Sequence, residues 1–354
     1  MPIPTLPGIT SETITSPRLT TRVLFAGAED GVPVLFLHGN TSSATWWEEV
    51  MTSLPAGFRA IAPDQRGFGD ADPSAYIDAT RGLGDLADDA VALLDQLGIA
   101  DAHLVGNSLG GNVVWRLLRD RPERIRSATQ VDPGSPYGFG GTRDAAGTPT
   151  TPDFAGSGGG LANPELLRRI TENDLSLDSP FSPRAALRTV IVRAPFVSPR
   201  EDALVQSMNA THIGPQDMPG DKVASPHWPF VAPGVWGAAN ALSPKYAGDV
   251  GGLVRLEHKP PILWIRGDSD LLVSDTAASD PGFLGSRGLL PGWPGAEAFP
   301  PQPMVSQIRA VLADYARAGG MINEVVLTDA GHAPYIEKLD AFNAAFHAHV
   351  LRWR

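Results

Sequence analysis

Residues 104–111, Leu-Val-Gly-Asn-Ser-Leu-Gly-Gly, decide how the fold of this chain is interpreted. An apolar run ends at Ser108, which lies between glycines, and a segment of helical character follows at once. This pattern is typical of a strand that turns sharply into a helix, with the serine on the turn. Such a turn leaves no room for side chains two residues before and after the serine, and Gly106 and Gly110 meet that requirement.

Ser108 stands where its hydroxyl would project from the sheet, as in a nucleophile elbow. The pattern alone is weak, because a chain with 38 Gly among 354 residues contains G-x-S-x-G by chance in roughly a quarter of cases. A serine hydroxyl also needs a base within hydrogen-bonding reach and an acid that orients the base. The interpretation of Ser108 as a nucleophile therefore depends on the rest of the chain.

The composition predicts a globular protein: 42% of residues are hydrophobic and 19% are charged. The formal net charge of −11 argues against a nucleic-acid partner. The absence of Cys excludes disulfides, thiolate catalysis and Cys-ligated metals. Neither a membrane span nor a signal peptide is apparent, so we expect a soluble, cytoplasmic protein without a membrane partner. The oligomeric state stays open, a homo-oligomer included.

Strands and helices alternate in the two outer parts of the chain. Strands are expected at 21–25, 32–37, 58–62, 103–105, 127–131, 262–265 and 324–327. Helices are expected at 46–54, 86–97, 110–118, 305–316 and 341–351. This order predicts an α/β protein with a doubly wound, mostly parallel sheet.

The alternation stops between residues 133 and 259, which we interpret as a helical cap inserted into a core of residues 1–132 and 260–354. Three helix starts are legible there, at Asn163-Pro164, at Ser182-Pro183, and at Ser198-Pro199 with Glu201 as a capping-box residue. The stretch 271–303 is long for a structureless connection, which favours a functional or packed loop.

An acid and a histidine follow late strands in the order that a serine triad needs. The strand at 262–265 leads into Arg-Gly-Asp-Ser-Asp, which ends at Asp270, and the strand at 324–327 leads to His332. The carboxyl ends of parallel strands meet at one edge of a sheet, where Ser108 would also lie. An acid can orient a histidine, which can then accept the serine proton.

The chain resembles the capped esterases, dehalogenases and epoxide hydrolases of the α/β-hydrolase fold over residues 20–132 and 260–354. The resemblance rests on four motifs in the family's order: Leu37–Asn40, Pro63–Gly69, the Ser108 elbow, and the Asp270 and His332 loops. It implies that Ser108 is the nucleophile, His332 the general base and Asp270 the orienting acid. It also implies an oxyanion hole formed by the backbone N–H groups of Asn40 and Leu109.

We interpret the other polar residues near these motifs as structural. Asp268 is interpreted as a hydrogen-bonding neighbour of Asp270, and His38 as a residue that shapes the oxyanion loop. No metal site and no cofactor are predicted, because the acidic residues after 267 lack the pattern of a calcium loop. Six aromatic residues could line a substrate pocket, while those in the insertion could equally form its own small core: Trp46, Phe181, Phe196, Trp228, Phe230 and Trp236.

The identity of the residue at the elbow restricts which reactions the enzyme could catalyse. The loop at Leu37–Ser43 is similar to that of haloalkane dehalogenases, but those enzymes and epoxide hydrolases use aspartate at the elbow, where this chain has Ser108. A serine favours acyl transfer, so we predict a carboxylesterase-type hydrolase of class EC 3.1.1, acting on an ester or lactone of a medium-sized apolar small molecule. The alternatives are a C–C bond hydrolase of the meta-cleavage type, a prolyl-type aminopeptidase, a cofactor-free perhydrolase, and a non-enzymatic ligand receptor.

Overall fold

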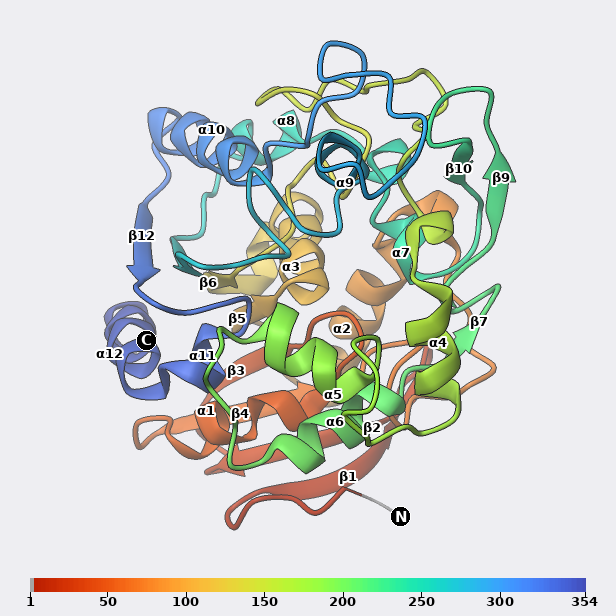
Figure 1. Cartoon of the computed structure of the whole chain (residues 1–354). Helices are drawn as coiled ribbons and strands as arrows, with labels where there is room; N and C mark the ends of the chain where they lie inside the picture. Colours follow the sequence, from red (N-terminus) through yellow and green to blue (C-terminus); the bar gives the residue numbers. More distant parts are fainter. Residues whose placement is uncertain (1–2) are drawn as a thin grey trace.

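One eight-stranded sheet forms the centre of the molecule in the computed structural model, which describes residues 3–354 (Figure 1). The strand order is β1-β2-β4-β3-β5-β6-β11-β12. Strand β2 pairs antiparallel with β1 and β4, and all other neighbours pair in parallel. The predicted doubly wound, mostly parallel sheet is therefore confirmed. Its strands are β1 (Thr10–Thr15), β2 (Thr20–Gly27), β3 (Val32–Leu37), β4 (Phe58–Pro63), β5 (Ala102–Asn107), β6 (Ile125–Val131), β11 (Ile262–Gly267) and β12 (Ile322–Leu327).

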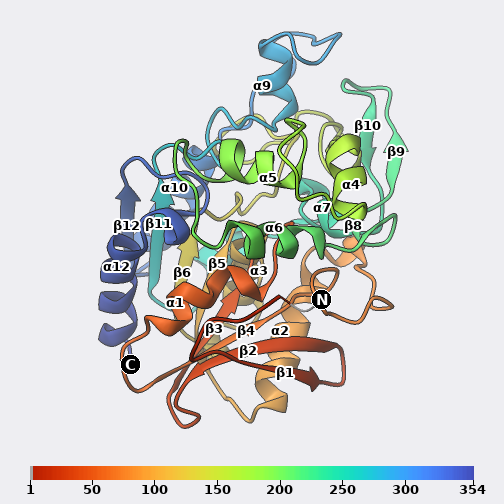
Figure 2. The same cartoon turned by 60° about the horizontal axis from the view of Figure 1, so that its bottom comes forward.

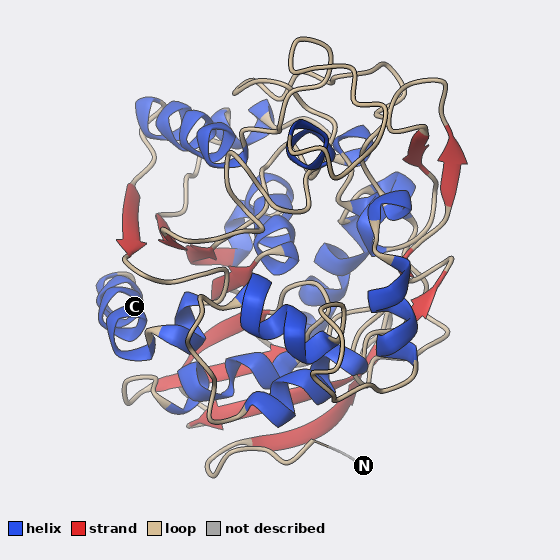
Figure 3. Ribbon diagram, in the orientation of Figure 1, coloured by secondary structure: helices blue, strands red, loops and turns tan. Residues whose placement is uncertain are grey.

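Helices cover both faces of the sheet and enclose two hydrophobic cores (Figure 3). Helices α2, α3 and α10 pack on one face, and η1, α1 and α12 pack on the other. Strands β3 and β5 contribute side chains to both cores, because successive residues of a strand point to opposite faces. The core helices are η1 (Ala44–Trp47), α1 (Glu48–Thr52), η2 (Ala79–Arg81), α2 (Gly84–Gln96), α3 (Leu109–Asp120), η3 (Pro122–Arg124), α10 (Met304–Arg317), α11 (Pro334–Glu337) and α12 (Leu339–Arg352).

The segment between β6 and β11 contributes no strand to the main sheet. In Figure 2 it lies, in green, on the side of the sheet toward which β12 points. It is less helical than expected, because it also contains two small two-stranded sheets, β7–β8 and β9–β10. Its elements are η4 (Gly159–Leu161), α4 (Pro164–Thr171), α5 (Pro183–Ala186), the π-helix η5 (Leu187–Ile191), α6 (Glu201–Asn209), β7 (Ile213–Gly214), β8 (Met218–Pro219), β9 (Lys222–Ala224), β10 (Val231–Pro233), α7 (Ala238–Ala241), η6 (Pro244–Tyr246) and α8 (Gly251–Val254).

Two of the three predicted helix starts in this segment are observed. Asn163 and Ser182 cap α4 and α5 through their side chains, each followed by proline at the first helical position. The third predicted helix start, at Ser198-Pro199, is wrong, because α6 begins at Glu201. The Glu201 carboxylate pairs with Arg184 and Arg188 instead of closing a capping box on Ser198. Ion pairs of one carboxylate with two guanidinium groups, from α5 and η5, are more favourable than a hydrogen bond to one backbone N–H.

Two further local features differ from the sequence prediction. Strand β1 was not expected, because five of its six residues are exposed and no apolar alternation marks it. The helix expected at 46–54 begins earlier, as the 3₁₀ turn η1, because Ser43 accepts a hydrogen bond from the Thr45 N–H. The long stretch 271–303 contains α9 (Pro281–Ser286), capped by Asp280, and its residues 286–298 are exposed or half-buried.

Candidate active site

Four polar residues follow neighbouring parallel strands of the main sheet. Ser108 follows β5, Asp132 follows β6, Asp270 lies just beyond β11, and His332 lies just beyond β12. These strands are neighbours in the sheet, so their carboxyl ends lie at one edge. Open parallel sheets commonly place ligands and catalytic groups at this edge.

Ser108 occupies a strained turn between β5 and α3. Its φ of +53° lies in the left-handed region that side chains rarely adopt. The turn is tight on both sides: a Cβ at Gly106 would lie 2.4 Å from the Gly110 carbonyl oxygen, and one at Gly110 would lie 2.1 Å from the Leu37 carbonyl oxygen. Ser108 itself stays partly exposed. The turn thus holds the serine at the first turn of α3, within reach of solvent.

His332 and Asp270 form a buried hydrogen-bonded pair. The His332 Nδ1 lies 2.8 Å from Asp270 Oδ2, with side-chain exposures of 6% and 2%. Asp270 Oδ1 accepts hydrogen bonds from the backbone N–H groups of Leu272 (2.7 Å) and Val273 (3.0 Å). A carboxylate only accepts, so Nδ1 carries the proton and Nε2 keeps its lone pair. A histidine in this tautomer can act as a base through Nε2.

The loop after β3 lies directly against the serine. A Cβ at Gly39 would lie 3.2 Å from the Cβ of Ser108. His38 organises this loop: its Nε2 accepts from the Gln65 backbone N–H (2.9 Å), and its Nδ1 lies 2.8 Å from the Gly39 carbonyl oxygen. Complete burial lowers the pKa of His38 to about 4. His38 is therefore neutral at physiological pH and serves as a structural bridge, as expected.

The two expected oxyanion donors keep free N–H groups. Among the hydrogen bonds of residues 3–354, none is donated by the backbone N–H of Asn40 or of Leu109. Leu109 is the first residue of α3, a helix of 12 residues, whose amino end carries partial positive charge. Such a helix end favours an anion, which is what an oxyanion hole must hold.

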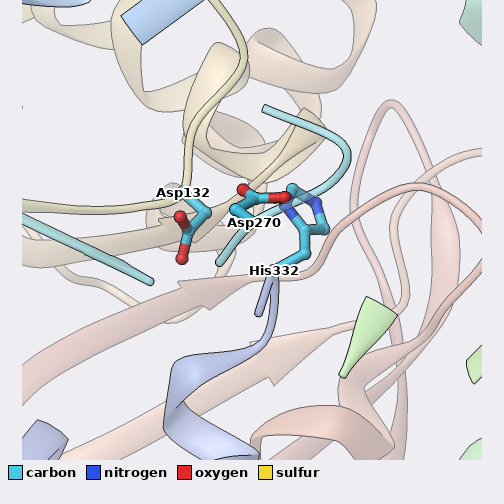
Figure 4. Close-up of side chains that lie close together, drawn as sticks. All are labelled: Asp132, Asp270 and His332. Carbon is cyan, nitrogen blue, oxygen red and sulfur yellow. Dashed lines mark hydrogen bonds and ion pairs between the residues drawn. The ribbon is translucent and has the colours of Figure 1, made fainter. Parts of the chain in front are cut away.

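Asp132 is a member of this site that the sequence analysis did not identify. It is fully buried, and the ligating atoms of Asp132, Asp270 and His332 lie within 4.8 Å of one another. Figure 4 shows Asp132 on the opposite side of Asp270 from His332. These three are the one cluster of the described chain whose ligand atoms lie close enough for a metal ion. The only signal in the sequence was its position directly after a strand.

Asn107 and Glu337 were also missed, and both connect the His332 loop to its surroundings. Asn107 Nδ2 donates to the carbonyl oxygens of Val131 and His332, both at 3.1 Å. Glu337 accepts from the backbone N–H groups of Gly331 and Arg193, both at 2.8 Å. Burial raises the pKa of Glu337 above its usual range. The histidine loop is thus joined to the elbow strand and to the insertion.

The neighbouring aspartates have structural partners. Asp268 accepts from the Asp329 backbone N–H (2.9 Å) and from the Ser269 hydroxyl (2.8 Å), in agreement with its expected role in the loop. Asp275 accepts from the N–H and hydroxyl of Ser306 in α10. Neither contacts His332 in the described structure.

The six aromatic residues proposed for a pocket do not gather around one cavity. Phe181 and Phe230 are exposed, at 46% and 61%. Trp228 packs edge-on against Phe299, with ring centroids 4.8 Å apart, and so belongs to the core of the insertion and the 271–303 loop. Trp46 is buried in the core on the α12 face, while Phe196 and Trp236 are half-buried. The pocket assignment stays a prediction.

Two small cavities lie away from the serine. One, of about 40 Å³, is bordered by Trp115, Arg116 and Tyr246. The other, of about 20 Å³, lies between Leu19 and Leu93. Neither is lined by Ser108 or His332. Their size suits water rather than an organic substrate.

No helix within residues 3–354 is both long and apolar enough to cross a membrane.

Comparison with known proteins agrees with this architecture. Residues 32–158 match the sequence model of a family described as alpha/beta hydrolase fold. The chain is 32% identical over 131 residues to the AB hydrolase superfamily protein YfhM of Bacillus subtilis, a match that covers 37% of this chain and 46% of that protein. The chain thus spans less than half the length of this curated relative.

Solved structures resemble the chain over nearly its whole length. A putative aryl esterase from Burkholderia cenocepacia superimposes with a TM-score of 0.59 at 21% identity, over 97% of this chain and 99% of that one. The 2-hydroxy-6-oxo-6-phenylhexa-2,4-dienoate hydrolase from Rhodococcus sp. strain RHA1 gives 0.58 at 20% identity, over 97% and 98%. At this identity, the likeness shows a shared fold.

Proposed function

We propose that this chain, which belongs to the α/β-hydrolase fold superfamily, is a serine hydrolase that cleaves a carboxylic ester or lactone through an acyl-enzyme. The observation that carries the proposal is that Ser108, on its strained turn, and the His332–Asp270 pair follow strands whose carboxyl ends share one sheet edge. A serine, a base and an orienting acid are the three groups that this reaction needs.

The proposed reaction starts with proton transfer from Ser108 to Nε2 of His332. The serine oxygen attacks the substrate carbonyl, and the resulting oxyanion accepts hydrogen bonds from the N–H groups of Asn40 and Leu109. Each donor of this kind contributes about 3 kcal/mol to transition-state stabilisation. His332 then protonates the leaving alkoxide, and the same base activates a water molecule that releases the acid and regenerates Ser108.

The insertion lies where it could select the substrate, for which we propose a medium-sized, mainly apolar molecule. Its backbone contacts the catalytic edge directly, because the His332 N–H donates to the Ile191 carbonyl oxygen of η5 (2.7 Å). A second contact joins α6 to the oxyanion loop through the hydroxyl groups of Ser207 and Ser43, 2.6 Å apart. A segment in this position limits the entry of water and shapes what reaches the serine.

A second candidate is cleavage of a C–C bond in a ring-cleavage product. It is favoured by the elbow residues 105–111, which resemble those of meta-cleavage hydrolases, and by the fold shared with the Rhodococcus dienoate hydrolase. Against it, the Leu37–Asn40 loop has a single glycine, where those enzymes carry more. We therefore favour the ester or lactone.

The test is a substrate panel applied to the purified protein and to Ser108→Ala. We expect turnover of p-nitrophenyl acetate or butyrate, and a fall in kcat of about 10⁶-fold in Ser108→Ala. A fluorophosphonate should label the peptide that contains Ser108, and the label should be absent in the variant. Circular dichroism at equal concentration checks that both proteins are folded.

The outcomes separate the candidate functions. Hydrolysis of dienones with little activity on esters or lactones would favour C–C cleavage. Activity that survives Ser108→Ala would refute the serine mechanism. Ligand binding without fluorophosphonate labelling would favour a receptor on the same fold.

A further inference from the structure

Asp132 contributes a second buried carboxyl group to the catalytic edge. It is the residue after β6, and its backbone N–H donates to the Ile265 carbonyl oxygen of β11 (3.0 Å). Its φ of +39° is left-handed, and its exposure is 1%. A residue so placed and strained is held by its surroundings, which is common at functional sites. The proposed triad chemistry assigns it no role.

The Asp132 and Asp270 carboxyl groups are close enough to form a hydrogen bond. Two carboxylates within 4.8 Å of each other in a dry site repel each other, which favours a proton on one of them. Burial raises the pKa of Asp132 well above its usual range, and the adjacent Asp270 raises it further. A shared proton converts a repulsive contact into a hydrogen bond.

The hydrogen-bond donors around the pair indicate which carboxyl group keeps the proton. Asp270 accepts from two backbone N–H groups and from His332, all within 3.0 Å. Asp132 accepts only from the Gly267 N–H, at 3.2 and 3.3 Å to its two oxygens. Because donors stabilise the ionised form, the negative charge is better placed on Asp270 and the proton on Asp132.

The other titratable groups nearby do not reverse this assignment. Arg266 is the cation that acts on Asp132, but its guanidinium is engaged by Glu324 and weakens the effect of burial only slightly. Tyr335 and Glu337 face the pair from α11, and burial raises the pKa of both, which favours their neutral forms.

We propose that Asp132 is a positioning residue that carries a proton and donates a hydrogen bond to Asp270, so that Asp270 keeps its charge and its orientation toward His332. Its catalytic consequence rests on the function proposed above. The protonation of Asp132 does not depend on that function, and it can be measured without a substrate.

The direct test is infrared spectroscopy of the resting protein at pH 7. We expect the carbonyl band of a protonated, hydrogen-bonded carboxyl group in the wild type and its loss in Asp132→Asn. Asparagine suits this position because it tolerates a left-handed φ. A difference spectrum of wild type minus Asp132→Asn that lacks this band would overturn the assignment of the proton whatever the protein catalyses, because the band of any other protonated carboxyl group cancels in the difference.

The positioning role is tested by two variants that both accept φ of +39°. Asp132→Gly removes the hydrogen-bond donor to Asp270. We expect kcat for the ester to fall by about 10- to 100-fold with little change in KM, because a displacement of a catalytic group by about 1 Å lowers the rate by about that factor. Asp132→Asn should restore most of the loss, because its amide N–H can replace the carboxyl donor. Equal kcat values in Asp132→Gly and the wild type would refute the role.

The acid limb of the kcat/KM profile distinguishes a neutral Asp132 from an ionised one. If Asp132 is neutral, Asp132→Asn removes no charge and the limb should shift by less than about half a pH unit. If Asp132 were ionised, removal of a negative charge that lies within 4.8 Å of the ligating nitrogen of His332 would move the acid limb down by at least about 2.5 pH units at an effective dielectric constant of about 20. A shift of that size, or activity lost on chelation and restored by Zn²⁺, would overturn the proposal.

Discussion

Asn107 offers the sharpest test of how the fold positions the catalytic base. Its side chain is 3% exposed and donates from Nδ2 to the carbonyl oxygens of Val131 and His332, both at 3.1 Å. The first bond joins β5 to β6, and the second joins β5 to the loop that carries the histidine. Replacement by alanine removes both donors and leaves two buried carbonyl groups with fewer partners.

The expected losses follow from these contacts. A hydrogen bond contributes about 1 kcal/mol net, and an acceptor left buried without a partner costs about 1–3 kcal/mol. Asn107→Ala should therefore lower the free energy of unfolding by about 2–4 kcal/mol. Because the His332 backbone loses a contact, a displacement of about 1 Å would lower kcat by about 100-fold.

Asn112 is a matched control in α3. It is 7% exposed, and its Nδ2 donates one hydrogen bond to a buried carbonyl group, that of Ser135 (2.9 Å), away from His332. Asn112→Ala should lower the free energy of unfolding by about 1–2 kcal/mol and leave kcat unchanged. Urea denaturation and ester kinetics measure both effects. If Asn107→Ala lost stability while its kcat matched that of Asn112→Ala, the positioning argument would be refuted.

Two further predictions concern the elbow and the buried histidines. Gly110→Ala places a Cβ 2.1 Å from the Leu37 carbonyl oxygen, so we expect the free energy of unfolding to fall by at least about 2 kcal/mol and kcat to fall about 100-fold. In the control Gly214→Ala, the nearest atom to the new Cβ would be 3.6 Å away, so neither quantity should change. Equal behaviour of the two variants would contradict the packing argument. Burial lowers the pKa of His103 to about 3. As the pH falls below about 6.5, this histidine is therefore protonated in the unfolded chain but not in the folded protein, and the free energy of unfolding decreases until the pH reaches about 3. At pH 5 the free energy of unfolding should be about 2 kcal/mol lower than at pH 7.5 because of this histidine. His103→Gln should reduce the difference between the urea midpoints at the two pH values. An unchanged difference would show that His103 is not the group responsible.

The sequence predicted the sheet well because buried parallel strands are marked by apolar runs. The bounds of β3 were predicted without error, β5 differs from prediction by one residue at its start and two at its end, and β6, β11 and β12 each differ by two residues at one end only. The exposed edge strand β1 gave no such signal. The start of α6 was misplaced because Glu201 found guanidinium partners on other helices, which no local pattern records.

The candidate site was predictable to the extent that its residues belong to local motifs. Ser108, Asp270 and His332 each follow a strand within a recognisable turn, and the contact of His332 with Asp270 agrees with their expected relation. Asp132, Asn107 and Glu337 were missed, because their partners lie on other strands and loops.

By itself, the sequence determined the order of strands and helices, the elbow at Ser108, and the order of serine, acid and histidine along the chain. These properties depend on apolar periodicity and on glycines at a sharp turn, which are local. Only the tertiary structure decided that Asp132 lies beside Asp270 and that Asn107 bonds to the His332 backbone. The physical reason is that the sheet brings the ends of β5, β6, β11 and β12 together, and burial there, beside Asp270, raises the pKa of Asp132.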